Sequence, residues 1–229
     1  MFRPDLGMLD GAYVAVWEGV DGSGKTTLMN ETSVRLRSMG YSVEFYKTPS
    51  ETATGLFAKE YGNKEDTDPL TRMLIFLANT ADDSKILKTI IREKKPEFMF
   101  VDRYYACSIV YGFALLSKRF SKKYSGESLI HFLKHVEELG SEIFVKPDLT
   151  IVVDIDPVTR MQRALSKQAG SDAAFERDEE LQNLVRFYYD QLVEQLGGCA
   201  LKVFNADNTL KQLSHSIAED LVRKREMLR

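Results

Sequence analysis

Cysteine, tryptophan and histidine are scarce in this chain of 229 residues, which has two, one and three of them. Cys107 and Cys199 lie far apart and form no C-x-x-C pair, so the sequence predicts neither a disulfide framework nor a zinc site. We therefore expect the protein to be located in a reducing cytoplasm. No stretch approaches the roughly 18 consecutive apolar residues of a membrane span. The first eleven residues contain Asp5 and Asp10 and no apolar run, so no targeting segment is predicted.

Charge of either sign is not in large excess, because 31 Lys and Arg stand against 34 Asp and Glu, a formal net charge of -3. This balance excludes a global attraction to nucleic acid or to an anionic membrane. The basic stretch from Lys118 to Lys123 is a candidate nucleic-acid surface, and a solvated face is its plainer interpretation. We expect small molecules as partners, with neither nucleic acid nor membrane among them.

The chain does contain short apolar runs that alternate with longer amphipathic ones. Strands are predicted near 13–18, 42–47, 98–102, 149–155 and 201–205, and helices over 25–39, 69–93, 104–117, 127–139, 157–168, 177–196 and 208–226. Such alternation is typical of a parallel sheet with helices on both faces. We predict one α/β domain over residues 1–229, a three-layer sandwich with a five-stranded parallel sheet and a lid near 164–178.

Residues 19–26 read GVDGSGKT and match the phosphate-binding motif G-x-x-x-x-G-K-[ST] of P-loop NTPases, between a predicted strand and a predicted helix. Glycines let several backbone N–H groups converge on phosphate oxygens, and the helix adds the positive end of its dipole. Lys25 supplies a charge to the β- and γ-phosphates and Thr26 a hydroxyl to Mg²⁺. A glycine-rich turn without a ligand is the plainer alternative. The predicted nucleotide-binding residues are Gly19, Asp21, Gly22, Ser23, Gly24, Lys25, Thr26 and Thr27.

A second group of candidates ends the third predicted strand, 98–102. Asp102 ends an apolar strand, which is the position where P-loop proteins place a carboxylate beside Mg²⁺. The plainer alternative is that Asp102 only starts a turn, because many strands end in Asp for that reason. Thr26 and Asp102 are therefore the predicted metal ligands. Arg103 follows at the end of the strand where open parallel sheets bind ligands, and a guanidinium there suits a phosphate held by two parallel hydrogen bonds.

Together these motifs resemble the thymidylate kinases. The likeness rests on residues 18–27 (EGVDGSGKTT), 102–104 (DRY) and 185–189 (VRFYY), and it extends over roughly residues 12–220. It implies transfer of the γ-phosphoryl group of ATP to the 5′-phosphate of dTMP, giving dTDP, with Mg²⁺ and a homodimeric enzyme. The chemistry of the residues agrees, because an attacking phosphate dianion needs no strong general base.

The resemblance also assigns roles to individual residues. Asp21 would bind the acceptor sugar, and Phe76 would stack on its base or would be an ordinary core residue. Lys59 would bind phosphate or be a surface lysine, and Tyr104 would shape the sugar pocket or only pack. The predicted acceptor-binding residues are Asp21, Pro49, Lys59, Phe76, Thr80, Arg103, Tyr104 and Tyr111. The predicted catalytic residues are Lys25, Asp102, Arg103 and Lys167.

The chain departs from the family pattern in both halves of the site. Thr80 stands where the family usually has an arginine that binds the thymine carbonyl, and Gly112 where many members have a base-reading amide. These changes predict altered base choice. No arginine occurs from 164 to 176, where members without one in the glycine loop carry a catalytic arginine, and Lys167 is the cation of that stretch. Residues 47–51 (KTPSE) lack the arginine and glutamate that the family usually has before the proline of its phosphate-binding turn, and Lys47 is the expected, weaker substitute for that arginine.

Three other functions remain open at this point. The first is a monophosphate kinase whose acceptor is a different pyrimidine monophosphate. The second is a deoxynucleoside kinase, which needs a carboxylate base such as Glu18 or Glu51. Alternatively, the protein binds ATP without turnover and acts as a regulator. A GTPase is disfavoured because the sequence has no N-K-x-D motif.

Overall fold

Five parallel strands form the centre of the molecule. The computed structural model describes residues 9–166, 173–206 and 209–228. In this part of the chain the strands lie in the order β2-β3-β1-β4-β5, and every neighbouring pair is parallel. Their bounds are β1 Tyr13–Gly19, β2 Val43–Lys47, β3 Phe98–Asp102, β4 Leu149–Asp154 and β5 Ala200–Phe204. The predicted five-stranded parallel sheet is therefore confirmed, and β1 at its centre is the point where the strand order reverses.

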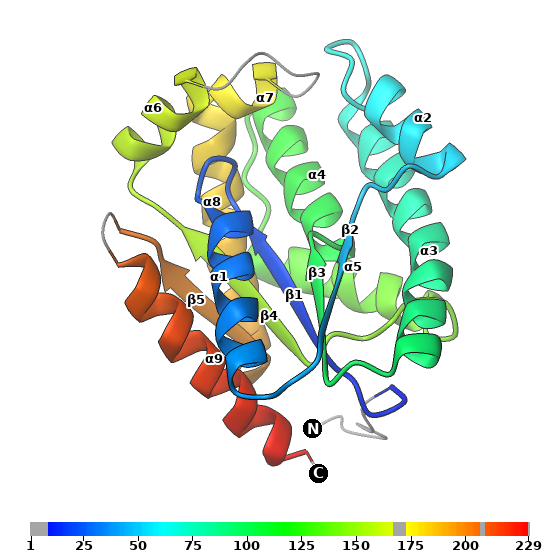
Figure 1. Ribbon diagram of the computed structural model, residues 1–229. Helices are drawn as coiled ribbons and strands as arrows, with labels where there is room; N and C mark the ends of the chain where they lie inside the picture. Colours follow the sequence, from blue (N-terminus) through cyan, green and yellow to red (C-terminus); the bar gives the residue numbers. More distant parts are fainter. Residues whose placement is uncertain (1–8, 167–172, 207–208, 229) are drawn as a thin grey trace.

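Helices cover both faces of this sheet, as Figure 1 shows. Alternate residues of β1 belong to different cores, because successive side chains of a strand point to opposite faces. Val14 and Val16 pack with α3, α4, α5 and α8, whereas Tyr13, Ala15 and Trp17 pack with α1 and α9. The helices are α1 Lys25–Ser38, α2 Ala53–Tyr61, α3 Pro69–Lys94, α4 Tyr105–Phe120, α5 Gly126–Leu139, α6 Pro157–Ser166, α7 Ala173–Arg177, α8 Glu179–Leu196 and α9 Leu210–Glu226, with a 3₁₀ turn at Gly197–Cys199. This arrangement is the expected three-layer sandwich.

Side chains at the ends of the helices explain where several of them begin. Asp68 accepts hydrogen bonds from the amides of Leu70 and Thr71 at the start of α3, and Pro69 occupies its first turn. Thr52 accepts one from the amide of Gly55 at the start of α2. Helix α2 was not predicted, because its nine residues have a weak apolar pattern. Helix α7 was also missed, and five residues are too short for a periodic signal.

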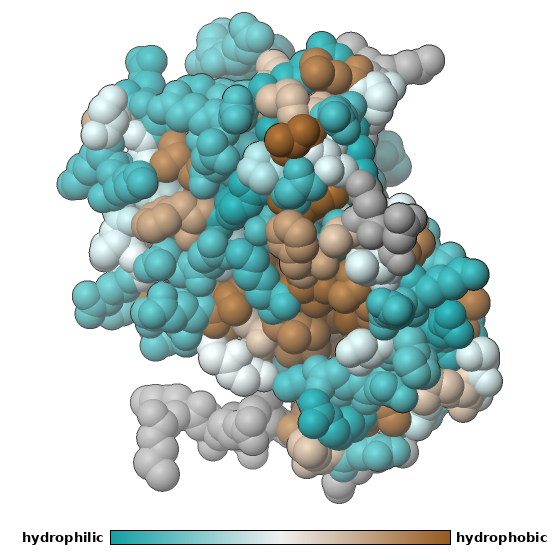
Figure 2. Space-filling model, turned by 90° about the vertical axis from the view of Figure 1, so that its left-hand side faces the viewer, coloured by the Kyte–Doolittle hydropathy of each residue, from teal (hydrophilic) through white to brown (hydrophobic). Residues whose placement is uncertain are grey.

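The side of the molecule formed by α6 and the edge strand β5 is mostly hydrophilic, with hydrophobic groups gathered near its centre (Figure 2). Large exposed hydrophobic side chains include Phe204 on β5 and Val158 and Leu165 on α6. Within the described ranges, no helix is both long enough and hydrophobic enough to span a bilayer.

Candidate active site

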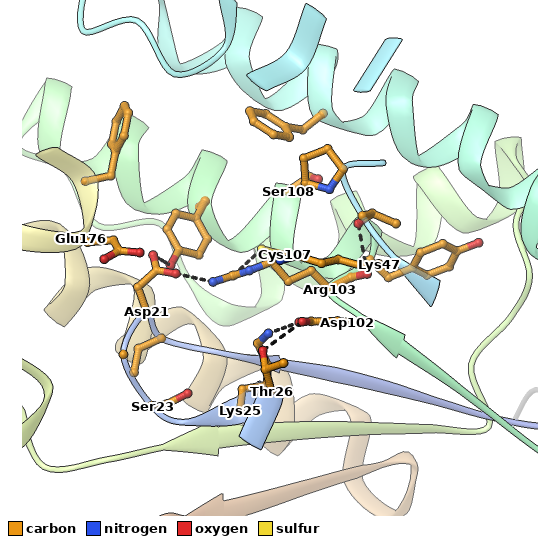
Figure 3. Close-up of a pocket in the computed structure, with 18 of the residues that line it drawn as sticks. Asp21, Ser23, Lys25, Thr26, Lys47, Asp102, Arg103, Cys107, Ser108 and Glu176 are labelled. Atoms are coloured by element: carbon orange, nitrogen blue, oxygen red, sulfur yellow. Dashed lines mark hydrogen bonds and ion pairs between the residues drawn. The ribbon is translucent and has the colours of Figure 1, made fainter. Parts of the chain in front are cut away.

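A cavity of about 1060 Å³ lies at the carboxyl ends of the strands. Its walls come from the loop between β1 and α1, the segments that follow β2 and β3, and helices α3 and α4. Open parallel sheets bind their ligands at this end, next to the strand where the order reverses. The predicted residues of the glycine loop and of 102–103 therefore meet in one place, as Figure 3 shows.

The glycine loop needs glycine at specific points. Gly19 has φ of 139°, and a Cβ there would lie 2.1 Å from the carbonyl oxygen of Val153. Gly24 has φ of 77°, and a Cβ there would lie 2.5 Å from Nδ2 of Asn205. That amide nitrogen donates to the carbonyl oxygen of Ser23 at 2.7 Å. The loop is therefore held close to β4 and to the residue after β5, with its backbone in a conformation that other residues rarely adopt.

Lys25, Thr26 and Asp102 form a compact polar group at the base of the loop. The Lys25 ammonium is ion-paired with Oδ1 of Asp102, and the Thr26 hydroxyl donates to Oδ2 at 3.1 Å. Burial alone would raise the pKa of Asp102, but the charge and hydrogen bond of Lys25 outweigh it and lower that pKa. Burial, together with the charge of Arg103, lowers the pKa of Lys25, and Asp102 opposes this shift. Asp102 therefore stays an anionic oxygen donor facing the loop.

These residues fit a magnesium-bound polyphosphate. The hydroxyl of Ser23 is buried and has no hydrogen-bond partner among the described residues, and the first amides of α1 lack intrahelical acceptors. Such donors suit phosphate oxygens. Mg²⁺ usually takes one or two protein oxygens and completes its shell with waters and phosphate. Thr26 and Asp102 offer that number, and the described residues contain no group of three or more His, Cys, Asp or Glu that could hold a metal by itself.

On the opposite side of the cavity, Arg103 is fixed by several contacts. Its guanidinium is ion-paired with Oδ1 of Asp21, and Nη1 donates to Sγ of Cys107 at 3.0 Å. The hydroxyl of Tyr111 donates to the other oxygen of Asp21. Burial would raise the pKa of Asp21, but the charge of Arg103 and the hydrogen bond from Tyr111 keep it below its usual value. Arg103 also has φ of 66°, so the chain turns sharply where this side chain leaves β3.

The other predicted acceptor residues differ in their surroundings. Pro49, Lys59, Phe76 and Thr80 line the cavity. Lys59 is ion-paired with Glu51 at the cavity wall. The hydroxyl of Thr80 donates to the carbonyl oxygen of Phe76 at 2.9 Å, which occupies its proton within α3.

The hydroxyl of Tyr104 contacts Ser84 and accepts from the amide of Val145, an arrangement that favours the packing interpretation of this residue. Lys167 lies outside the described residues. The predicted lid, residues 164–178, is described only in part, over 164–166 and 173–178.

Sequence reasoning missed several side chains of the cavity. Arg72 on α3 and Asn205 after β5 both line it, and Arg163 of α6 donates to the carbonyl oxygen of Gly22 at 3.4 Å. The one signal in the sequence that could have indicated Arg72 as a site residue was its position, as a basic residue, on the apolar face of α3. The contacts of Asn205 depend on how the strands are ordered, so no local pattern predicts them.

Glu18 was considered only as a possible base, and its contacts show a different role. It is fully buried and accepts hydrogen bonds from the amides of Tyr104 and Cys107 and from the hydroxyl of Tyr189. Burial raises its pKa to about 7, although Arg103 and the Tyr189 hydrogen bond oppose the shift. Glu18 therefore anchors the start of α4 to β1.

The parallel sheet and the phosphate loop at the end of its central strand define a P-loop NTPase. A family model described as thymidylate kinase matches residues 17–217. The chain belongs to the thymidylate kinase family.

Individual relatives agree with this assignment. A protein of Sulfurisphaera tokodaii named "Probable thymidylate kinase" is 29% identical over 210 residues, 90% of this chain and 96% of the relative. The thymidylate kinase of Caldanaerobacter subterraneus subsp. tengcongensis is 28% identical over 182 residues, 78% of this chain and 80% of the relative. The solved thymidylate kinase of Candida albicans has the same fold, with a TM-score of 0.67 and 20% identity over 93% of each chain.

Proposed function

We propose that this chain transfers the γ-phosphoryl group of ATP to the 5′-phosphate of dTMP, giving dTDP and ADP. The observation that carries the proposal is the placement of two cationic groups in one cavity. Lys25 lies at the glycine loop beside Thr26 and Asp102. Arg103 lies across the cavity from it and is ion-paired with Asp21. Membership of the thymidylate kinase family supports dTMP as the acceptor.

In this proposal the chain's own residues bind and orient two polyanions. The amides of the glycine loop and Lys25 hold the donor phosphates, and Thr26 and Asp102 hold Mg²⁺. Mg²⁺, when bound, neutralises charge on the transferred phosphoryl group. Arg103 receives the acceptor phosphate, and because that phosphate is already anionic, no residue has to remove a proton from it.

The contacts of two carboxylates weigh against a deoxynucleoside kinase, the nearest alternative. Such an enzyme needs a carboxylate free to accept the proton of a sugar hydroxyl. Both oxygens of Glu18 accept hydrogen bonds from the protein, and Glu51 is ion-paired with Lys59. A monophosphate acceptor is therefore the better match.

Further parts of the proposal rest on the resemblance. We infer that residues 1–229 form one kinase domain with a lid near 164–178 and that the enzyme is a homodimer. Lys167 is the proposed lid cation, and Arg163 is a second candidate because it contacts Gly22. A reducing cytoplasm suits the two free cysteines, Cys107 and Cys199.

A coupled ADP-release assay tests the proposal. The purified chain is incubated with ATP and Mg²⁺ and with dTMP, dUMP, dCMP, dGMP or thymidine. We expect turnover with dTMP and none with thymidine. Turnover with thymidine alone would make the chain a nucleoside kinase, and ATP binding without turnover on any acceptor would make it a regulator.

A further inference from the structure

Arg72 is a buried cation that lines the acceptor side of the cavity. Its side chain comes from the first turn of α3, the residue is 9% exposed, and Nη2 donates to Oδ1 of Asn63 at 3.2 Å. Asn63 is neutral, so this contact does not balance the charge.

No carboxylate in the described part of the chain lies within ion-pair distance of Arg72. Its Nε is buried and has no hydrogen-bond partner among the described residues. Burial accordingly lowers the pKa of Arg72. A buried charge without a counter-ion and a buried donor without an acceptor both destabilise a folded protein. Such an arrangement is expected where the missing acceptor is a ligand.

Two aromatic rings set the orientation of the guanidinium. Its central carbon lies 4.6 Å from the ring centroid of Phe76 and 4.8 Å from that of Phe175, which comes from α7. Tyr111 lies farther away, at 5.9 Å. Aromatic faces attract the cation, but they accept none of the in-plane hydrogen bonds that its N–H groups make. The rings therefore hold a planar set of donors that still needs acceptors in its own plane.

Neighbouring residues do not replace Arg72 in this role. Thr80 lies two helical turns along α3, and its hydroxyl donates to the carbonyl oxygen of Phe76. Arg103 is paired with Asp21. In the part of the cavity that the structure describes, Arg72 is the guanidinium that lacks a carboxylate partner and lies against Phe76.

We infer that Arg72 determines base specificity by donating to the 4-carbonyl oxygen of the acceptor base, and so favours a 2,4-dioxopyrimidine, thymine or uracil, over cytosine. The inference rests on the proposed monophosphate kinase activity. Arginine has donors and no acceptor. Thymine and uracil carry a carbonyl oxygen at C4, whereas cytosine carries an amino group at C4 and differs from them there rather than at its 2-carbonyl oxygen. That amino group would face the N–H groups of Arg72 and leave both without acceptors.

Steady-state kinetics of Arg72→Met and Arg72→Lys test the inference, with dTMP, dUMP and dCMP as acceptors. Methionine keeps much of the length and the ring contacts but removes the donors. We expect kcat/KM for dTMP and dUMP to fall about 10- to 100-fold in Arg72→Met, mainly through KM, while the value for dCMP changes little. Arg72→Lys keeps the charge but loses the planar pair of donors, so its kcat/KM for dTMP and dUMP should lie between those of the wild type and Arg72→Met.

The matched control is Arg92→Met, an exposed arginine on the same helix, which should leave all three values unchanged. Thermal unfolding without ligand separates recognition from packing. Removal of an uncompensated buried charge should not lower Tm, whereas removal of a structural arginine would.

Three results would overturn the inference. One is an unchanged preference for dTMP over dCMP in Arg72→Met. Another is an equal loss for all acceptors together with a lower Tm, which would make Arg72 a packing residue. The third is a selective loss with dGMP, which would mean that the acceptor is a purine. A wild-type chain that turns over no monophosphate would instead refute the proposed function itself.

Discussion

The guanidinium of Arg103 is ion-paired with the carboxylate of Asp21 across the mouth of the glycine loop. Asp21 thus belongs to the loop proposed to bind the donor and also fixes the cation proposed to receive the acceptor. The hydroxyl of Tyr111, from α4, holds the other oxygen of the same carboxylate. One acidic side chain therefore sets the distance between the two halves of the site.

Loss of the Arg103 guanidinium should weaken use of the acceptor more than use of ATP. Arg103→Ala is expected to lower kcat/KM for dTMP by about 100-fold, the effect of one strong charge-assisted contact, and to change KM for ATP little. Initial rates at varied dTMP and varied ATP measure both values. An equal rise in both KM values would contradict the division of the cavity into donor and acceptor sides.

A double variant separates this binding role from stability. Arg103→Ala leaves Asp21 as a largely buried anion without its cation, which should cost about 3 kcal/mol of unfolding free energy. Arg103→Ala combined with Asp21→Asn should recover part of that loss in urea denaturation without recovering activity. Recovery of activity would mean that Arg103 acts only to hold Asp21.

Lys25 is expected to be essential for turnover. Lys25→Ala removes the ammonium group at the glycine loop and should lower kcat by at least about 100- to 1000-fold. ADP release at saturating dTMP measures it. Lys85→Ala is the matched control, because Lys85 is exposed on α3 and forms an ion pair with a neighbouring surface carboxylate, Asp82. Normal activity in the Lys25 variant would refute the assignment of the donor site.

Gly19 should not tolerate even one methyl group. A Cβ at this position would lie 2.1 Å from a backbone oxygen of β4, and its φ of 139° is strained for other residues. Gly19→Ala is expected to lower the free energy of unfolding by about 3 kcal/mol or more. Gly198→Ala is the control, since nothing lies within 4 Å of a Cβ there. Similar urea midpoints for the two variants would contradict the close approach of β1 to β4.

The buried carboxyl of Glu18 should make stability depend on pH. Its pKa is about 7 in the folded chain, whereas its ordinary value, taken for the unfolded chain, is 4.5. Between pH 4.5 and pH 7 the folded chain therefore holds a proton on Glu18 that the unfolded chain has released. The stability that this group contributes is therefore full below pH 4.5 and is lost as the pH rises through 7.

Urea denaturation of the wild type and Glu18→Gln measures that contribution. Between pH 5 and pH 8, the unfolding free energy of the wild type relative to the variant should decrease by about 2 to 3 kcal/mol. The comparison cancels the titration of other groups, such as Asp148, whose pKa burial raises to about 6. A difference that is constant with pH would show that Glu18 stays ionised in the folded state.

Most of the fold was predictable from sequence because its signals are local. Apolar runs mark the strands, and the predicted bounds agree with the observed ones within one residue at either end. The glycine loop and residues 102–103 lie at the carboxyl ends of two parallel strands, so the direction of the sheet brings them together. Helix α2 escaped prediction because its stability depends on packing against α3 rather than on its own pattern.

The polar residues of the cavity were harder to predict, because the role of a buried polar group depends on what other segments bring to it. Glu18 contacts residues that lie 86 to 171 positions away in sequence. Arg72 stands in a helix whose cavity-facing residues include Phe76 and Thr80, and only the folded chain shows that no described carboxylate pairs with it. Distances along the chain carry no information of this kind.

Lys47, Asp102 and Trp17 lie side by side in the registers of β2, β3 and β1. Deleting a single residue from β3 would therefore shift Asp102 by one position and exchange the two faces of the strand, so that a carboxylate and a guanidinium would be misplaced together. Length variation among relatives should accordingly be excluded from β3 and confined to connections at the amino ends of the strands, such as residues 95–97 before β3, where the chain can be lengthened without moving either charge.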